Sequence, residues 1–401
     1  MKRFLLLLFL FPGIVSAQNG GTIESRYGIG ELDLMATARQ RAMGAVTSAL
    51  SSGTDVSLTN PAGWSMVEQL RLQGGLTLEH LSMERGDASS NSGAVKGFQF
   101  VFPLEDSWKL SLGTAVLPVS RSSYKTTAIG SVEGEDYTTT YEGSGGVSLF
   151  RAGLAIEALP HLRVGLSYQY YFGTIDQDWE LKFANGSYFT SRQTRATSHS
   201  GSGLLAGLLY DGIRDLTIGI TVHPATELQA SRNLLLQYST RDSTLAGKSG
   251  IQDYPLLFQV GAAYQLSEKI LVAAEYSTQD WTDAIVFDRK QNELGLTYKL
   301  GAGVEWQPYK DELGYRALAE TAFRMGFYYQ QPYLMINDDV SKEYFITAGA
   351  GFPIFGGNRG DFALEYGWRE GNSDLLGRQN IIRASVTISV GESWFKRNSD
   401  K

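Results

Sequence analysis

Strict alternation of apolar and polar residues recurs along most of this 401-residue chain and narrows its fold more than any other feature. In residues 162–172 every second side chain is apolar, and the positions between them hold residues such as Arg163, Gly165 and Ser167. The same period of two appears at residues 294–306, 362–368 and 382–390. Successive side chains of a β-strand point to opposite faces, so each run predicts a strand with one apolar face.

The composition of the two faces separates a membrane barrel from a water-soluble sandwich. The apolar face often ends in an aromatic residue, as at Tyr264, Tyr298 and Trp306, whereas the other face carries charges, glycine and small hydroxyls. Aromatic girdles and a polar lumen are typical of outer-membrane barrels. Each run also has the ~9–11 residues that a tilted spanning strand needs. The sequence therefore predicts an all-β fold, a transmembrane antiparallel β-barrel.

Short and long connections alternate between the predicted strands. Short turns are predicted near residues 105–106, 160–161, 211–212, 267–268, 310–311 and 358–359. Longer polar stretches, interpreted as loops, lie at residues 83–93, 119–146, 176–201, 225–252, 279–291, 330–342 and 370–378. This pattern predicts about 14 strands, give or take ~2, over residues 69–396. The first strand is then expected to start, and the last strand to finish, on the periplasmic side, followed by a polar tail at 397–401.

The first residues indicate export. Lys2 and Arg3 precede an apolar run, and Ala17 completes a small-residue cleavage site, so residues 1–17 are predicted to be a signal peptide. The chain has no cysteine, which excludes a lipidated N-terminus, disulfides and thiolate metal sites. The formal charge of −7 becomes −9 without Lys2 and Arg3, so nucleic acid is not an expected partner. The expected location is the outer membrane of a Gram-negative bacterium.

Residues 18–68 lack the alternation and are predicted to form a plug, or hatch, within the barrel. Arg41-Ala42-Met43-Gly44, followed by Asn60-Pro61-Ala62-Gly63 just before the first strand, resembles the N-terminal hatch of FadL-type outer-membrane transporters of hydrophobic compounds. Pro61 fixes φ and favours extended geometry at Asn60, whose side chain can bond nearby backbone. We expect this turn to end the plug and direct the chain into the first strand.

The resemblance implies passive uptake of an apolar ligand, such as a long-chain fatty acid, through a barrel gated by the hatch at Asn60, Pro61 and Ala62. In that family an inward kink of the third strand accompanies a lateral opening, and here Pro118 lies at the outer end of the third predicted strand. Pro118 is therefore the candidate strand-3 kink. The expected partners are a hydrophobic small molecule and outer-membrane lipid, and the ligand-binding residues are not identified.

Cations on the predicted lumen face have nearby acids on the same face. The cations are Arg151, Arg163, Lys299, Arg324 and Arg383, and the acids include Glu157, Glu275, Glu305 and Glu365. We interpret most of these cations as ion-pair partners of lumen acids rather than as ligand contacts.

Catalytic and metal-binding patterns are weak. The four histidines have no spacing suited to a metal, and no cofactor is expected. His199, near Ser200 and Ser202 in a predicted loop, is the only candidate for a barrel esterase, and Arg359-Gly360-Asp361 is interpreted as a turn. The chain is not expected to be an enzyme.

Two functions remain open from the sequence. The first is a hatch-gated transporter of fatty acids or other hydrophobic molecules. The second is a FadL-like scaffold that holds a protein partner in secretion or surface attachment, and the polar composition of residues 119–146 and 225–252 suits such a surface. A general polar porin is disfavoured by the plug of some fifty residues.

Overall fold

A computed structural model describes residues 23–84, 89–184, 188–238, 241–308, 321–336, 339–354, 357–370 and 378–396. The predicted signal peptide, the turn at 310–311 and the tail at 397–401 lie outside these residues. Within them, no helix is long and apolar enough to cross a membrane.

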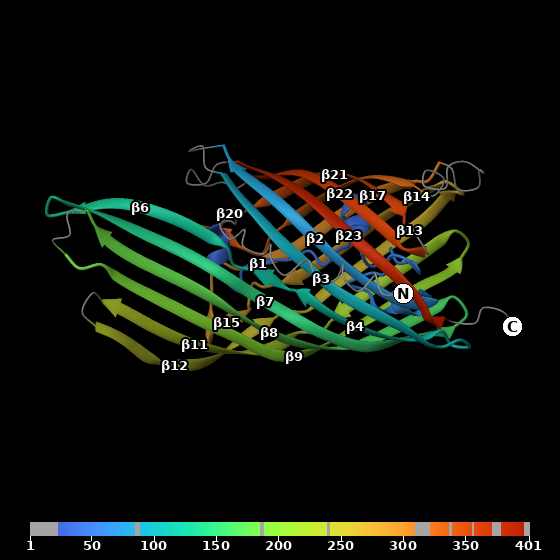
Figure 1. Ribbon diagram of the computed structural model, residues 1–401, viewed down its shortest axis with the longest axis horizontal. Coiled ribbons are helices and arrows are strands. Elements are labelled where there is room, and N and C mark those ends of the chain that lie inside the picture. The colour runs from blue at the N-terminus through green and yellow to red at the C-terminus, as the bar shows by residue number, and fades with distance from the viewer. Residues whose placement is uncertain are drawn as a thin grey trace, which may run out of the picture.

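The predicted barrel is confirmed, and fourteen strands pair antiparallel around it in the described part of the chain. In order, they are β2 (Gln69–Met83), β3 (Ser89–Glu105), β4 (Leu110–Pro118), β7 (Glu135–Leu159), β8 (Leu162–Phe183), β9 (Ser191–Ile213), β10 (Leu216–His223), β13 (Leu257–Ser267), β14 (Ile270–Asp280), β17 (Leu296–Trp306), β18 (Ala322–Gln331), β21 (Lys342–Pro353), β22 (Arg359–Glu370) and β23 (Gln379–Lys396). Pairing of β2 with β23 closes the ring (Figure 1).

The remaining elements lie outside this ring of fourteen. They are η1 (Ile23–Arg26), β1 (Glu31–Leu32), α1 (Ala38–Ala42), η2 (Pro61–Met66), β5 (Ser120–Arg121), β6 (Tyr124–Val132), β11 (Thr226–Tyr238), β12 (Arg241–Tyr254), β15 (Ile285–Val286), β16 (Arg289–Lys290), β19 (Met335–Ile336) and β20 (Asp339–Val340).

Three of the stretches predicted to be loops are strands instead. Residues 119–146 contain β6 and half of β7, residues 176–201 contain the ends of β8 and β9, and residues 225–252 contain β11 and β12. Figure 1 shows these strands continuing beyond the compact barrel as one curved wall. We call this wall, together with the β15–β16 hairpin that pairs with β12, the outer cup.

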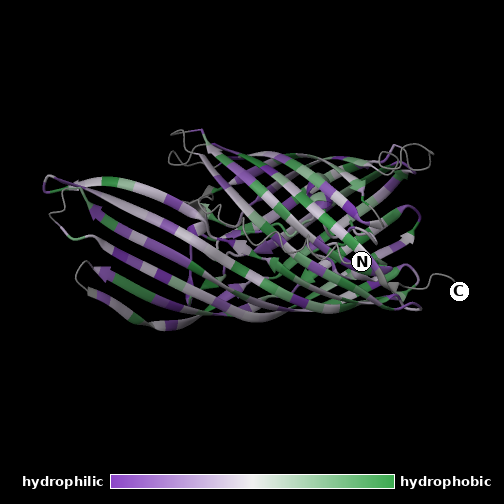
Figure 2. Cartoon of the chain, viewed as in Figure 1, coloured by the Kyte–Doolittle hydropathy of each residue, from purple (hydrophilic) through white to green (hydrophobic). Residues whose placement is uncertain are grey.

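The outer cup escaped prediction because the alternation of the barrel strands does not continue into it, as β8 illustrates. On β8 the outward side chains from Val164 to Phe172 are apolar and exposed. Beyond Gly173 the same face carries Thr174, Asp176, Asp178, Glu180 and Lys182. Ile175 and Trp179 occupy the inward face there. Figure 2 shows the corresponding change from many green bands on the barrel to mostly purple and white on the cup.

One predicted turn is displaced. Asp211 and Gly212 still belong to β9, and the turn to β10 lies at Arg214 and Asp215. The turn is built around Asp215, whose φ of 61° places it in the left-handed region that aspartate tolerates better than most residues.

Candidate functional site

Residues 23–68, here called the inner segment, contact strands all around the ring. Helix α1 packs on β18, β21, β22 and β23, whereas η2 packs on β4, β7, β8 and β9. Segments that touch opposite walls at once must lie in the lumen. The local folds follow from the sequence, since Thr37 and Gln40 form a capping box at the start of α1.

Glycines on the barrel wall receive the Arg41–Gly44 segment. A Cβ added at Gly303 would come within 3 Å of Met43, and one added at Gly301 or Gly326 would come within 3 Å of Gly44. The obstacle is backbone in each case, so the wall and the inner segment touch main chain to main chain. We call this contact the first glycine seam.

A second glycine seam receives the Asn60–Ala62 turn on the other side of the lumen. A Cβ at Gly165 would meet the backbone of Pro61 and Ala62, and one at Gly207 would meet Asn60 and Pro61, each within 3 Å. Asn60 is fully buried and extended, as predicted. Its amide accepts from Ala62 N at 3.0 Å and donates to the carbonyls of Ser48 at 2.7 Å and Leu208 at 3.1 Å.

Buried ion pairs join the inner segment to the wall. Arg39 contacts Glu305 at 2.8 Å, and Arg41 contacts Glu365 at 3.2 Å. The fully buried Glu275 accepts from the amides of Thr47 at 2.7 Å and Ser48 at 2.6 Å. These bonds satisfy charged groups that burial would otherwise destabilise.

The predicted pairing of the lumen cations is confirmed for four of the five. Lys299 contacts Glu275 at 3.0 Å, and Arg324 contacts both Glu305 at 2.6 Å and Asp361 at 2.7 Å. Arg383 contacts Glu79 at 2.6 Å, a partner that sequence reasoning did not name.

Arg163 and Arg151 differ from the other cations. Arg163 lies beside the short turns, where Asp211 and Glu157 are its partners. Arg151 is the exception among the five, because it donates to the carbonyl of Leu58 in the inner segment.

A cavity of about 190 Å³ lies against the inner segment. Leu32, Leu34 and Met35 of that segment contribute apolar surface to it. Charged side chains also line it, including Arg41, Lys96, Arg121, Glu79 and Glu343. Its size and mixed lining suit a compact molecule better than an extended acyl chain.

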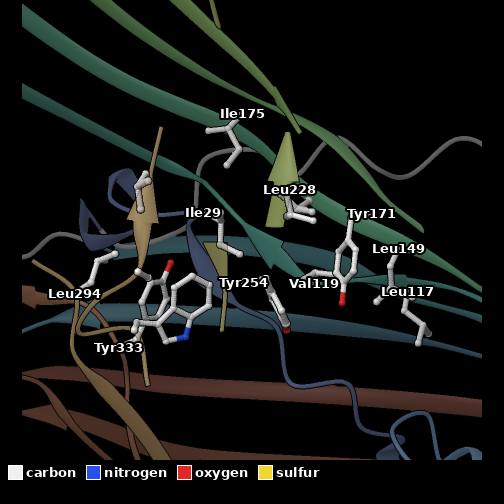
Figure 3. Close-up of a cluster of buried hydrophobic side chains, with 14 of the residues drawn as sticks. Ile29, Leu117, Val119, Leu149, Tyr171, Ile175, Leu228, Tyr254, Leu294 and Tyr333 are labelled. Atoms are coloured by element: carbon white, nitrogen blue, oxygen red, sulfur yellow. The ribbon is translucent and has the colours of Figure 1, made fainter. Parts of the chain in front are cut away.

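An aromatic layer crosses the lumen next to this cavity (Figure 3). Tyr171 packs on Tyr254 at 5.4 Å between ring centroids, Tyr254 on Trp281 at 5.7 Å, and Trp281 on Tyr333 at 4.5 Å. Apolar side chains fill the rest of the layer, among them Ile29, Leu117, Val119, Leu149, Ile175, Leu228 and Leu294. The layer was not predicted because its members come from many separate segments of the chain. Leu294 begins the alternation at 294–306, which would place it on the outward apolar face, but it is buried in the layer.

Two joined cavities lie on the cup side of the aromatic layer. Their volumes are about 460 and 670 Å³, and both are lined by Tyr27, Arg195, Arg232 and Phe287. Ile175 and Val286 of the aromatic layer line the first of them. Tyr254 and Tyr333 of the same layer line the inner cavity. The layer therefore separates the inner cavity from the cup.

The third spanning strand, β4, ends at Pro118, as the sequence predicted. Pro118 still pairs with Ser148, but the following β5 pairs with β1 of the inner segment. Beyond Phe98, β3 pairs only with β2 within the described residues, so the ladder between the third strand and its neighbour stops here. Arg121 bridges from this point to Ser92 and Glu79, each at 2.9 Å.

The remaining sequence candidates are placed in strands. His199, predicted in a loop, lies in β9 with only 5% of its surface exposed, because the predicted loop is part of the outer cup. Arg359 and Asp361 open β22, where Asp361 binds Arg324 instead of forming a turn. The described residues contain no cluster of three or more potential metal-ligating side chains.

A family model described as BamG matches residues 1–399 of the chain. No curated protein matches it.

Solved structures with the same fold share little sequence with this chain. A FadL homologue from Pseudomonas aeruginosa superposes with a TM-score of 0.62 at 12% identity, over 90% of this chain and 99% of that one. The toluene transporter TbuX from Ralstonia pickettii gives 0.60 at 16% identity, over 90% and 99%. The monoaromatic hydrocarbon channel CymD gives 0.59 at 14% identity, with the same coverage. The FadL-like fold inferred from the hatch motifs is thus confirmed.

Proposed function

Because this chain belongs to the BamG family and has a FadL-like barrel, we propose that it is an outer-membrane protein that passively takes up small hydrophobic molecules. The exposed apolar side chains on the outer wall, such as Phe98, Leu166 and Ile388, support insertion in lipid. A water-facing surface rarely carries so wide an apolar band.

The aromatic layer is the observation that carries the proposal. It lies between the inner cavity and the cavities of the cup, and Trp281 at its centre is fully buried. Moving a hydrated ion into such surroundings costs far more than moving an apolar molecule. The layer would therefore pass hydrophobic compounds and retain solutes that need water.

The hatch assignment of Asn60, Pro61 and Ala62 is retained in a narrower form. The main chain of Pro61 and Ala62 is packed against Gly165, and the side chains of Asn60 and Pro61 against Gly207, so we assign all three residues to anchoring the hatch. Residues 31–35 line the inner cavity and meet β5 instead of a glycine seam. We propose that residues 31–35 move to open and close the path, while the two glycine seams hold the rest of the inner segment in place.

The contacts next to Pro118 support an exit of the ligand sideways through the barrel wall. Above Pro118 the ladder is replaced by side-chain contacts of Arg121 and by the ion pair between Lys96 and Asp33 at 2.5 Å. Side chains can rearrange faster than a β-ladder can open. Release sideways at this point would need no separation of paired strands.

Uptake by cells distinguishes the ligand classes. Radiolabelled toluene and a radiolabelled long-chain fatty acid are offered to a Gram-negative host lacking its own transporters. We expect toluene uptake above the empty vector, a smaller or absent fatty-acid signal because of the small inner cavity, and altered uptake in Asn60→Ala and Pro61→Ala.

The control variant is Asn233→Ala, on the exposed face of β11. All variants are compared at matched amounts of heat-modifiable protein in the outer membrane. A folded protein that takes up neither compound would refute the transport proposal.

The second candidate function is a scaffold for a protein partner. The outer cup favours it, because strands β7, β8 and β9 have 25, 22 and 23 residues. A spanning strand needs only ~9–11 residues. A transporter has no evident need for so tall a wall on one side.

A further inference from the structure

Four cations gather on the inward surface of the outer cup. A fifth basic residue, Lys290, also lines the larger cavity, but it pairs with Asp283 at 2.5 Å. Of the other four, Arg195 lies on β9, Arg232 on β11, Lys248 on β12 and Arg289 on β16, and all four line the same cavity. Arg232 and Lys248 are directly opposite one another across the β11–β12 ladder. Like charges in such pairs are destabilising, so the local sequence works against the stability of this hairpin.

These cations have no acidic partner at ion-pair distance among the described side chains, in contrast to the arginines near the inner segment. Arg232 stacks over the ring of Phe287 at 3.7 Å and donates weakly to Thr197. Burial, Arg195 and Arg289 together lower the pKa of Arg232. The cluster is therefore a concentration of uncompensated positive charge.

Three acids line the same cavities. Asp178 borders the smaller cavity from the outward face of β8, where its side chain pairs with Arg192 at 3.0 Å. Asp288 accepts from the amide of Ile251 at 2.7 Å. Glu293 is the third. His199, also in the lining, is buried, and its Nδ1 has no hydrogen-bond partner among the described atoms. The cavity thus contains both unneutralised cations and an unsatisfied polar atom.

Apolar side chains continue the same inward face. Leu234 pairs with Arg195 on one side and with Leu245 on the other, and nearly half of the Leu245 surface is exposed. The described pairing leaves residues 241–249 of β12 with β11 as their only neighbour, so their outer edge is open, whereas Ile251 bonds Asp288. An open edge presents unpaired N–H and C=O groups, which an extended polypeptide can use.

We propose that the outer cup binds an extended acidic polypeptide segment of a partner protein, with carboxylates on Arg195, Arg232, Lys248 and Arg289 and apolar side chains on Leu234 and Leu245. A polypeptide accounts for the cations, the leucines and the open edge together. A small anion would use only the cations. The two joined cavities also exceed what one carboxylate fills.

Peptide binding to the purified full-length protein in nanodiscs tests the proposal. The probe is a short fluorescein-labelled peptide of alternating glutamate and leucine, read by fluorescence anisotropy. Comparison peptides replace glutamate by lysine or leucine by serine, and citrate tests a small anion as competitor. We expect binding of the glutamate–leucine peptide alone, weakening as salt rises because exposed charges are screened.

Charge reversal locates the site. Arg195→Glu/Arg232→Glu should weaken peptide binding by roughly tenfold or more. The control Lys125→Glu/Lys182→Glu changes two exposed cations of β6 and β8, one of which forms only a surface pair with Glu142, and should leave binding within about twofold. Arg232→Gln provides a milder variant in case the reversal prevents folding.

Three results would overturn the proposal. One is no binding to the wild-type protein at physiological salt, and another is equal binding to the reversed and control variants. The third is displacement of the peptide by citrate at similar concentrations, which would indicate a small-anion site. Uptake of toluene is measured separately, so failure of transport and failure of peptide binding are distinguishable.

Discussion

Charged side chains around the inner segment have partners of opposite charge, whereas the cations of the outer cup do not. Around the inner segment, Arg39, Arg41 and Arg324 each meet a carboxylate. In the cup, Arg195 and Arg232 face each other's charge instead. A region whose charges are neutralised internally is built to stay in place. Cations without such partners remain available to bind an acidic partner such as the one we propose for the cup.

The largest expected effect concerns the glycine seams that hold the inner segment. Gly326→Ala and Gly165→Ala each place a Cβ within 3 Å of backbone atoms of the inner segment. Overpacking usually costs about 1–3 kcal/mol, and more is expected where backbone is the obstacle. We expect most of the heat-modifiable barrel to be lost in gel-shift assays. Gly93→Ala, whose nearest neighbour is a Leu78 side chain at 3.3 Å, should fold normally. Equal yields would contradict close seam packing.

Removing one buried carboxylate should have the next largest effect. Glu275→Gln leaves Lys299 without its partner, and breaking such a pair costs about 3–5 kcal/mol. Denaturant unfolding followed by tryptophan fluorescence measures the loss. Glu275→Gln/Lys299→Met removes both charges and should recover part of it. A single variant as stable as the wild-type protein would show that the pair does not hold the inner segment.

Asp55 is an exception within the inner segment and gives a pH-dependent prediction. Its carboxylate is buried 3.7 Å from Arg39, and neither oxygen has a hydrogen-bond partner among the described atoms. Burial raises the pKa of Asp55, although Arg39 opposes this. The stability it contributes is therefore present below the unfolded pKa of about 3.9 and is lost as the pH rises through the folded value.

Asp55→Asn should accordingly be more stable than the wild-type protein at neutral pH, and the difference should shrink toward pH 4. Unfolding midpoints across this range test it. A difference that grows as the pH falls would mean that the Arg39 pair, not burial, dominates.

The smallest expected effect tests the cup. Arg232→Gln removes the like charge opposite Lys248, so we expect a gain of about 0.2–1 kcal/mol in the free energy of unfolding. Arg324→Gln, the matched change beside the inner segment, should instead destabilise the protein because Asp361 and Glu305 each lose one charged partner. If Arg232→Gln and Arg324→Gln lowered the free energy of unfolding by similar amounts, the proposed difference between the cup and the inner segment would be wrong.

The sequence predicted the spanning strands well because lipid on one side and a polar lumen on the other impose the same alternation on each. It did not predict the outer cup, since the outward face of β8 becomes polar and the apolar side chains move to the inward face near Gly173. The wall glycines, Gly301 and Gly303 among them, were recognised as inward-facing. Their role as seams was not predictable, because a glycine carries no side-chain signal of what it contacts. Arg151 was missed for a related reason, since its partner is a backbone carbonyl.

The pairing of β2 with β23 closes the wall around the inner segment. The inner segment precedes β2 in the chain, while β23 ends the ring. Its two seams lie on different parts of that ring, one on β17 and β18 and the other on β8 and β9. A segment that is enclosed and contacts both parts of the ring links strands that do not pair with one another. Loss of the inner segment would therefore remove contacts from both parts of the barrel wall at once.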